Sequence, residues 1–119
     1  MWDVEVTDAF AAWYADLDPE QQDRLNAAVD ELAARGPSLG RPWVDTLAGS
    51  RLPNLKELRV HRAGHLRVLF VFDPRRTAIL LLGGDKSGRW AEWYRWAIPE
   101  AERLYAEYLE ELRREGLVE

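Results

Sequence analysis

Apolar and polar residues alternate near the start of the chain and again in its middle, and this period of two predicts β-strands. The first predicted strand is the segment WDVEV at residues 2–6. Three more are expected at about residues 55–61, 65–72 and 77–83, with the turn DPRRT between the last two. Because these three strands follow one another closely, we expect a mostly antiparallel sheet in the middle of the chain.

Apolar residues recur at helical spacing between the first strand and the middle of the chain. Thr7 can cap a helix over the segment DAFAAWYADL. Asp18 begins a second helix as its N-cap, with Pro19 at the first helical position and Gln21 completing a capping box, and Gly36 ends that helix. The two helices follow each other so closely that a helical hairpin is predicted.

The remaining segments complete the predicted order β-α-α-β-β-β-α. Residues 38–54 are rich in Gly and Pro and are expected to form a connecting loop. The segment GGDKSGRW at residues 83–90 is predicted as a second loop, a short helix follows from about residue 89, and Pro99 suits the start of a separate last helix. The pattern indicates a single α+β domain over residues 1–119, with a helical hairpin packed on a mostly antiparallel sheet and a C-terminal helix.

The hairpin formed by the strands at 55–61 and 65–72 has a register that can be derived from its apolar face. A three-residue turn, Arg62-Ala63-Gly64, places Arg59 directly opposite Arg67 and His61 opposite His65. A two-residue turn would mix the buried and exposed faces, so the three-residue turn is favoured. Two like charges that face each other on a sheet repel. The sequence therefore raises the question of what balances this arginine pair.

Charge is distributed unevenly along the chain. Residues 51–95 carry ten Lys or Arg against four acidic residues, a net charge of +6, whereas residues 1–50 carry −7 and residues 96–119 carry −4. A basic middle indicates a surface that faces a polyanion, although a solvated sheet face would have a similar composition. The chain has no cysteine and only two histidines, which argues against disulfides, thiolate chemistry and a His-rich metal site.

The arginine pair is the main candidate for chemistry. Arginine presents planar, bidentate donors suited to phosphate, and a histidine beside it could transfer a proton near neutral pH. The alternative is an internal carboxylate, either Glu57 on the same strand or one from the last helix. A further group places basic residues beside aromatic ones, a combination that suits binding of single-stranded RNA. Its members are Lys86, Arg89, Trp90 and Tyr94.

The segments LKELRV, HLRVLFVF, AILLLGGDKSG and AIPEAERLYAEYLEEL, in this order, resemble the RelE/ParE toxin superfamily and most closely its HigB-like, phage-derived subgroup. The resemblance implies a RelE-like fold and the toxin of a type II toxin–antitoxin pair. Such toxins usually cleave mRNA, commonly on the ribosome, by 2′-OH attack without metal or cofactor. Their partner is an antitoxin, here expected to carry a helix-turn-helix domain, with a homodimer or a hetero-oligomer as possible assemblies.

The resemblance also implies a site. Arg59 and Arg67 are assigned to the scissile phosphate, Lys86 to charge stabilisation, and His61 or His65 to proton transfer. The expected RNA contacts are Lys56, Arg62, Arg89, Trp90 and Tyr94, although the register places Lys56 on the opposite face of the sheet.

Two other functions fit the same fold: a ParE-like gyrase inhibitor, and a binding module without catalysis whose arginines neutralise an acidic partner. The start of the chain lacks the pattern of a signal peptide, and its longest apolar run, TAILLL, is too short to cross a bilayer. We therefore expect a cytoplasmic protein with no membrane segment.

Overall fold

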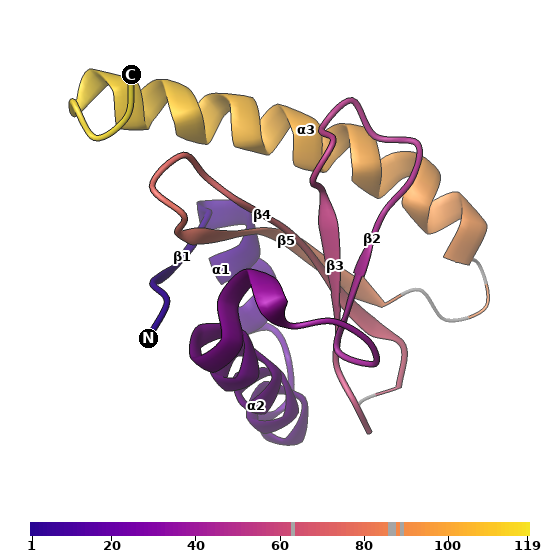
Figure 1. Cartoon of the computed structure of the whole chain (residues 1–119). Coiled ribbons are helices and arrows are strands. Elements are labelled where there is room, and N and C mark those ends of the chain that lie inside the picture. Colours follow the sequence, from indigo (N-terminus) through magenta and orange to yellow (C-terminus); the bar gives the residue numbers. More distant parts are fainter. Residues whose placement is uncertain (63, 86–87, 89) are drawn as a thin grey trace.

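The computed structural model describes residues 1–62, 64–85, 88 and 90–119, and the fold is a sheet between two helical layers (Figure 1). The elements in chain order are β1 (Val4–Val6), α1 (Asp8–Ala15), α2 (Pro19–Arg35), a short 3₁₀ helix η1 (Gly36–Ser38), β2 (Val44–Thr46), β3 (Lys56–Arg59), β4 (Leu66–Phe72), β5 (Ala78–Asp85) and α3 (Trp90–Arg114).

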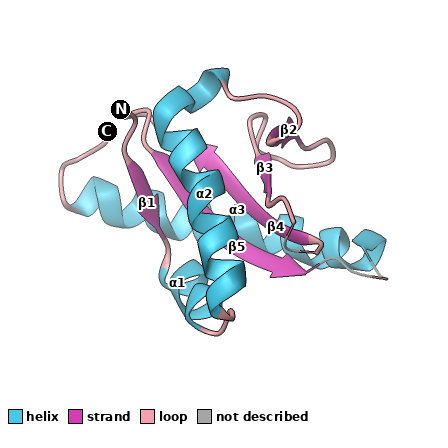
Figure 2. Cartoon of the chain, turned by 90° about the horizontal axis from the view of Figure 1, so that it is seen from below, coloured by secondary structure: helices cyan, strands magenta, loops and turns pink. Residues whose placement is uncertain are grey.

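The five strands lie in the order β1-β5-β4-β3-β2. β1 pairs in parallel with β5, and the other neighbours are antiparallel. The helical hairpin of α1 and α2 covers one face of the sheet, and α3 crosses the other (Figures 1 and 2). The α+β fold with a hairpin, a mostly antiparallel sheet and a C-terminal helix is confirmed.

The starts of the two hairpin helices agree with the sequence. The Thr7 hydroxyl accepts a hydrogen bond from the backbone N–H of Phe10, which caps α1. The Asp18 carboxylate accepts from the N–H of Gln21 at 2.8 Å, and the Gln21 side chain accepts from the N–H of Asp18 at 3.1 Å. This reciprocal pair satisfies two backbone donors that the first turn of α2 would otherwise leave open.

Three differences from the sequence-based expectation concern β2, β5 and α3. Residues 38–54 hold the short strand β2, which pairs with β3 so that Val44 lies opposite Leu58. Three residues are too few for an alternating pattern to be visible. β5 also continues two residues beyond the predicted end, through Gly83 and Gly84 to Asp85. A Cβ at Gly83 would overlap the Trp13 ring, so the absence of a side chain lets this strand pass close beneath α1.

The third difference is that α3 is one helix rather than two. Pro99 lies inside it, as its tenth residue. Proline inside a helix costs roughly 3 kcal/mol, because its ring removes a hydrogen bond and crowds the preceding turn. Ala97 and Ala101, on either side of Pro99, are both fully buried against the sheet. Packing against the strands therefore keeps the helix continuous. Tyr94 and Tyr108 consequently lie on the same helix.

Each face of the sheet has its own core. Under α1 and α2, buried side chains from the helices meet alternate strand residues such as Leu58, Val68 and Phe70. Under α3, the other residues of the same strands, including Leu69 and Ile79, pack against Ala97 and Ala101. Glu57, Arg59 and Arg67, which are described below, lie on the α3 face. No helix in the described part of the chain is long and apolar enough to cross a membrane.

Candidate active site

The arginine pair has the predicted register. Arg59 on β3 lies opposite Arg67 on β4, and the apolar pair Leu58 and Val68 occupies the other face. Gly64 has a φ of 69°, the left-handed conformation that the predicted turn requires. The hairpin therefore does bring two guanidinium groups together, and the structure shows what lies between them.

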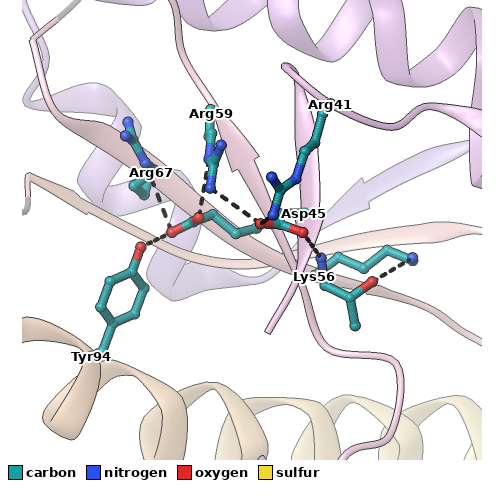
Figure 3. A network of polar contacts seen from close by, with 8 residues as sticks. Arg41, Asp45, Lys56, Arg59, Arg67 and Tyr94 are labelled. Carbon is teal, nitrogen blue, oxygen red and sulfur yellow. Dashed lines mark hydrogen bonds and ion pairs between the residues drawn. The ribbon is translucent and has the colours of Figure 1, made fainter. Parts of the chain in front are cut away.

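Glu57 lies between the two arginines and is 2% exposed. The Nε of Arg59 donates to Glu57 Oε2 at 3.4 Å, and the Nε of Arg67 is 3.8 Å from Glu57 Oε1. Tyr94, which α3 brings down over the sheet, donates its hydroxyl hydrogen to the same Oε1 (Figure 3). One buried carboxylate thus faces two cations and one phenol. The sequence indicated Glu57 only as a possible counter-ion, not as the centre of the site.

Arg67 is held less completely than the residues around it. Its side chain is 15% exposed, and its Nη1 donates to the backbone carbonyl of Leu66 at 2.8 Å. The buried Nε has no hydrogen-bond partner in the described structure. Burial lowers the pKa of Arg67, and the charge of Arg59 lowers it further while Glu57 opposes both. A buried donor without an acceptor is costly, so this position favours an added anion.

Arg59 is fixed from its other side by β2. Asp45 accepts from Arg59 Nη2 at 3.3 Å and from Arg41 Nη2 at 2.9 Å (Figure 3). Burial raises the pKa of the Asp45 carboxyl, but the hydrogen bonds from Arg41 and from the backbone of Thr46 outweigh it, and the pKa is lowered. Asp45 is therefore an anion that orients Arg59. Because β2 was not foreseen, neither was this contact.

Lys56 lies where the register placed it. It faces β2 on the opposite side of the strand from Glu57, and its Nζ is 3.4 Å from Thr46 Oγ1. His65 is exposed in the turn before β4. Lys86 and Arg89 lie outside the described residues, as does the side chain of Trp90.

The expected position of His61 beside the arginine pair is wrong. Its ring centroid is 4.5 Å from that of Trp43, and it lines a pocket with Arg24 of α2, on the other side of the sheet. Arg62 lines the same pocket. The physical reason is that β3 ends at Arg59, so the strand alternation that would place residues 59 and 61 on one face stops before His61.

A groove of about 870 Å³ lies next to the site on the α3 side. Tyr94 lines it, with Arg51 from the β2–β3 loop and Arg95 from α3. The loop is fixed to α3 by Glu102, whose carboxylate accepts from the Ser50 hydroxyl at 2.8 Å and the Arg51 N–H at 2.6 Å. Within the described residues, no group of three or more His, Asp or Glu side chains could hold a metal ion.

Comparison with known proteins identifies relatives of this chain. The chain is 44% identical to the putative toxin HigB2 of Mycobacterium tuberculosis over 110 residues, which cover 91% of this chain and 54% of that protein. It is also 44% identical to the putative toxin HigB3 of the same organism over 97 residues, which cover 82% of this chain and 84% of HigB3. The chain thus spans about half the length of one of these relatives and most of the other.

The RelE fold is shown by a solved structure. The RelE–RelB complex of the archaeon Pyrococcus horikoshii matches with a TM-score of 0.57 at 16% identity, covering 73% of this chain and 97% of the matched chain. The chain therefore has the fold of RelE. Residues 12–106 match the family described as phage derived protein Gp49-like, and the chain belongs to that family. The resemblance to the RelE/ParE superfamily and its HigB-like, phage-derived subgroup is confirmed.

Proposed function

We propose that this protein is the toxin of a type II toxin–antitoxin pair and that it acts by cleaving RNA. Its membership of the phage-derived family and its identity with two putative HigB toxins support the first part. The second part rests on the α3 face of the β3–β4 hairpin. One observation carries it: two arginines converge on a buried carboxylate and still leave the buried Nε of Arg67 without an acceptor.

The charge of this group explains why an anion would bind. Glu57, Arg59 and Arg67, which we call the hairpin cluster, have a net charge of +1, and the neighbouring ion pair of Asp45 and Arg41 adds no net charge to it. A phosphate bound at the exposed part of the Arg67 side chain, which is 15% exposed, would supply the missing negative charge. Arginine forks bind two oxygens of one phosphate at once, which fixes the orientation of the group as well as its position.

The arrangement supports internal transesterification of RNA. Glu57 takes the proton of a ribose 2′-OH while the 2′-oxygen attacks the adjacent phosphorus. The bond from phosphorus to the 5′-oxygen breaks, and that oxygen receives a proton from an acid, which leaves a 2′,3′-cyclic phosphate and a 5′-hydroxyl end. Arg59 and Arg67 stabilise the extra negative charge on the phosphorane. Every atom is conserved, and the scheme needs no metal.

The other assignments follow from position. Tyr94 donates to Glu57 and is therefore assigned to positioning the base. Lys86 keeps its predicted role in charge stabilisation, and His65 stays a candidate for the acid. Proton transfer was expected from His61 or His65; because His61 contacts Trp43 on the far side of the sheet, the role of base is assigned to Glu57.

The finer features of the function are part of the same proposal. Its partner is an antitoxin, supported by the complex in which the structurally similar RelE is bound to RelB. We propose that this antitoxin carries a helix-turn-helix domain. We also propose that the substrate is mRNA on the ribosome and that the protein works in the cytoplasm.

Induction of the protein in cells, followed by mapping of new transcript 5′ ends, tests the proposal. We expect growth arrest with new 5′-hydroxyl ends, and neither with Glu57→Gln. Arg114→Ala, which changes an exposed residue at the far end of α3, is the matched control and should stay toxic. Growth arrest with intact transcripts and gyrase-dependent DNA breaks would instead establish a ParE-like inhibitor.

A further inference from the structure

A second basic pocket lies at the hairpin turn, on the opposite face of the sheet from Glu57. We call it the hairpin pocket. It has a volume of about 480 Å³ and is formed by α2, the segment before β2 and the turn after β3. Its lining residues are Arg24, Ala27, Pro42, Trp43, His61 and Arg62. The proposed cleavage reaction uses none of these residues.

The charges of the hairpin pocket are unbalanced. Arg24 and Arg62 form no ion pair in the described part of the chain, and none of the described residues that line the pocket is acidic. Glu20 precedes Arg24 by one helical turn, a spacing that allows a salt bridge, yet the two are not paired. The imbalance is notable because residues 1–50 contain only three arginines against ten acidic residues. Two unpaired guanidinium groups in one pocket favour a polyanion.

The pocket also contains two aromatic rings. The rings of Trp43 and His61 are 4.5 Å apart between centroids and inclined at 87°, so they meet as the two walls of a corner. A nucleobase can stack on one wall while its edge faces the other. Stacking on aromatic side chains combined with cationic groups on the backbone is the usual way in which proteins bind single-stranded nucleic acid. An acidic peptide would use the arginines but would gain little from the rings.

The pocket adjoins the proposed active site through the backbone. Arg59 and His61 are separated by one residue, which corresponds to roughly 7 Å along an extended chain. The Arg59 N–H donates to the Trp43 carbonyl at 2.7 Å, which joins β3 to the segment that carries Trp43. An RNA strand leaving Arg59 around the edge of the hairpin would therefore reach the pocket with a neighbouring nucleotide.

We infer that the hairpin pocket binds a nucleotide of single-stranded RNA beside the cleaved phosphate, an inference that rests on the proposed function. Arg24 and Arg62 hold a phosphate of that nucleotide, and its base stacks in the corner of Trp43 and His61. His61 then acts in binding rather than in proton transfer.

Binding of a fluorescein-labelled 2′-O-methyl RNA oligomer of mixed sequence tests this inference, because the methyl group blocks cleavage and separates binding from reaction. Arg24→Glu should weaken binding at least roughly tenfold, the loss of one charge-assisted contact, and lower the slope of affinity against salt by about one. Arg35→Glu makes the same charge change on the same helix, about 16 Å away and beyond the screening length at physiological salt. It should alter affinity less than about twofold.

The ring protons of the histidines give a local readout, since the chain has only two of them. The oligomer should shift the NMR signals of His61 in the unmodified protein and should not do so in Arg24→Glu. Melting temperatures of both variants check that they remain folded. Poly-glutamate is the comparison probe, and it should shift His61 much less than the RNA does.

The outcomes separate this inference from the proposed function. Equal losses for Arg24→Glu and Arg35→Glu, unmoved His61 signals with bound oligomer, or an equal response to poly-glutamate would each overturn the pocket while leaving RNA cleavage intact. Absence of oligomer binding would also overturn it. Conversely, specific binding at His61 by a protein that cleaves no transcript in cells would retain the pocket and overturn the cleavage proposal.

Discussion

Two clusters on the α3 face are both built from arginine, carboxylate and tyrosine side chains, but their net charges have opposite signs. In the hairpin cluster, one buried carboxylate, Glu57, faces Arg59 and Arg67, and Tyr94 donates to it. In a second cluster at the other end of α3, a single arginine, Arg75, faces two carboxylates, Asp73 and Glu5, and Tyr108 donates to Glu5. We call this second group the turn cluster, because Asp73 and Arg75 lie in the β4–β5 turn.

The contacts show how the two clusters differ. In the turn cluster, Arg75 Nε is 2.7 Å from Asp73, and its two Nη atoms are 2.8 and 3.2 Å from the two oxygens of Glu5. The carboxylates raise the pKa of Arg75, so its charged form is stabilised. In the hairpin cluster the arginine contacts are 3.4 and 3.8 Å, and burial lowers the pKa of Arg67.

This difference distinguishes a structural cluster from one prepared for a ligand. The turn cluster has a surplus carboxylate and joins β1, the β4–β5 turn and α3, so its arginine has no further need of an anion. The hairpin cluster has a surplus cation and an unpaired buried donor. An unsatisfied buried polar group is a cost that stability alone does not explain. We therefore expect substitutions in one cluster to change activity and those in the other to change stability.

The largest expected effect is on activity at Arg67. Arg67→Ala should reduce RNA cleavage roughly 10²–10³-fold, because it removes a preorganised donor to the phosphorane. Its free energy of unfolding should stay unchanged or rise by no more than about 1 kcal/mol, because one of two facing cations is removed. Its melting temperature should therefore not fall. Cleavage assays and thermal unfolding on the same preparations measure both. A sharply lowered melting temperature, with toxicity kept by the folded fraction, would make Arg67 a structural partner of Glu57.

The next effect is on stability at Arg75. Arg75→Ala leaves the fully buried Asp73 without its ion-pair partner and should lower the free energy of unfolding by about 3 kcal/mol. Cleavage per folded molecule, measured well below the melting temperature, should be unchanged. Arg76→Ala is the matched control in the same turn, because the Arg76 guanidinium lies over the Trp2 ring, at 5.4 Å from its centroid, and forms no ion pair with the described residues. That contact is worth about 0.5–1 kcal/mol. If Arg75→Ala impaired cleavage as much as Arg67→Ala, the distinction between the clusters would be lost.

The two tyrosines of α3, Tyr94 and Tyr108, give a smaller and more direct comparison. Both lie on the same helix, and each donates a hydrogen bond to a glutamate on a strand. Tyr108→Phe should lower the free energy of unfolding by about 1.5 kcal/mol and leave cleavage unchanged, because a hydrogen bond to a charged group is lost. Tyr94→Phe should lower kcat with little change in KM, because it loosens the base and not the substrate. Kinetics and chemical denaturation of both variants measure this. If both variants changed cleavage and stability by the same amounts, the effects would come from α3 as a whole and not from the candidate active site.

Much of this arrangement was predictable because it follows local rules. The caps at Thr7 and Asp18 follow from residue type, and the pairing of Arg59 with Arg67 follows from the apolar face of the hairpin. The register was predictable because a shift of one residue would bury charges.

What the sequence could not predict depends on contacts between distant segments. Tyr94 reaches Glu57 across 37 positions, on a helix that continues through Pro99. No local pattern signals that continuity, which depends on burial against the sheet. Asp45 was missed because its strand is three residues long. The position of His61 does not follow from alternation, because β3 ends two residues before it, at Arg59.

The smallest expected effect is the acid sensitivity of the turn cluster. Hydrogen bonds from Arg75 and then from Tyr108 lower the pKa of Glu5 below its ordinary value of 4.5, although burial opposes them. A carboxyl whose pKa is lower in the folded state contributes stability above its unfolded pKa and loses it as pH falls through its folded pKa. Glu5→Gln should therefore melt at a lower temperature than the unmodified protein at pH 7, and the difference should narrow as pH falls below about 4.5. Melting temperatures between pH 7 and pH 3 measure this, and Tyr108→Phe, which keeps the stronger Arg75 contact, should give an intermediate narrowing. If the melting temperatures of Glu5→Gln and the unmodified protein differed by the same amount at every pH, Glu5 would not be stabilised as an anion. The hydrogen bonds of the turn cluster would then be weaker than their distances indicate.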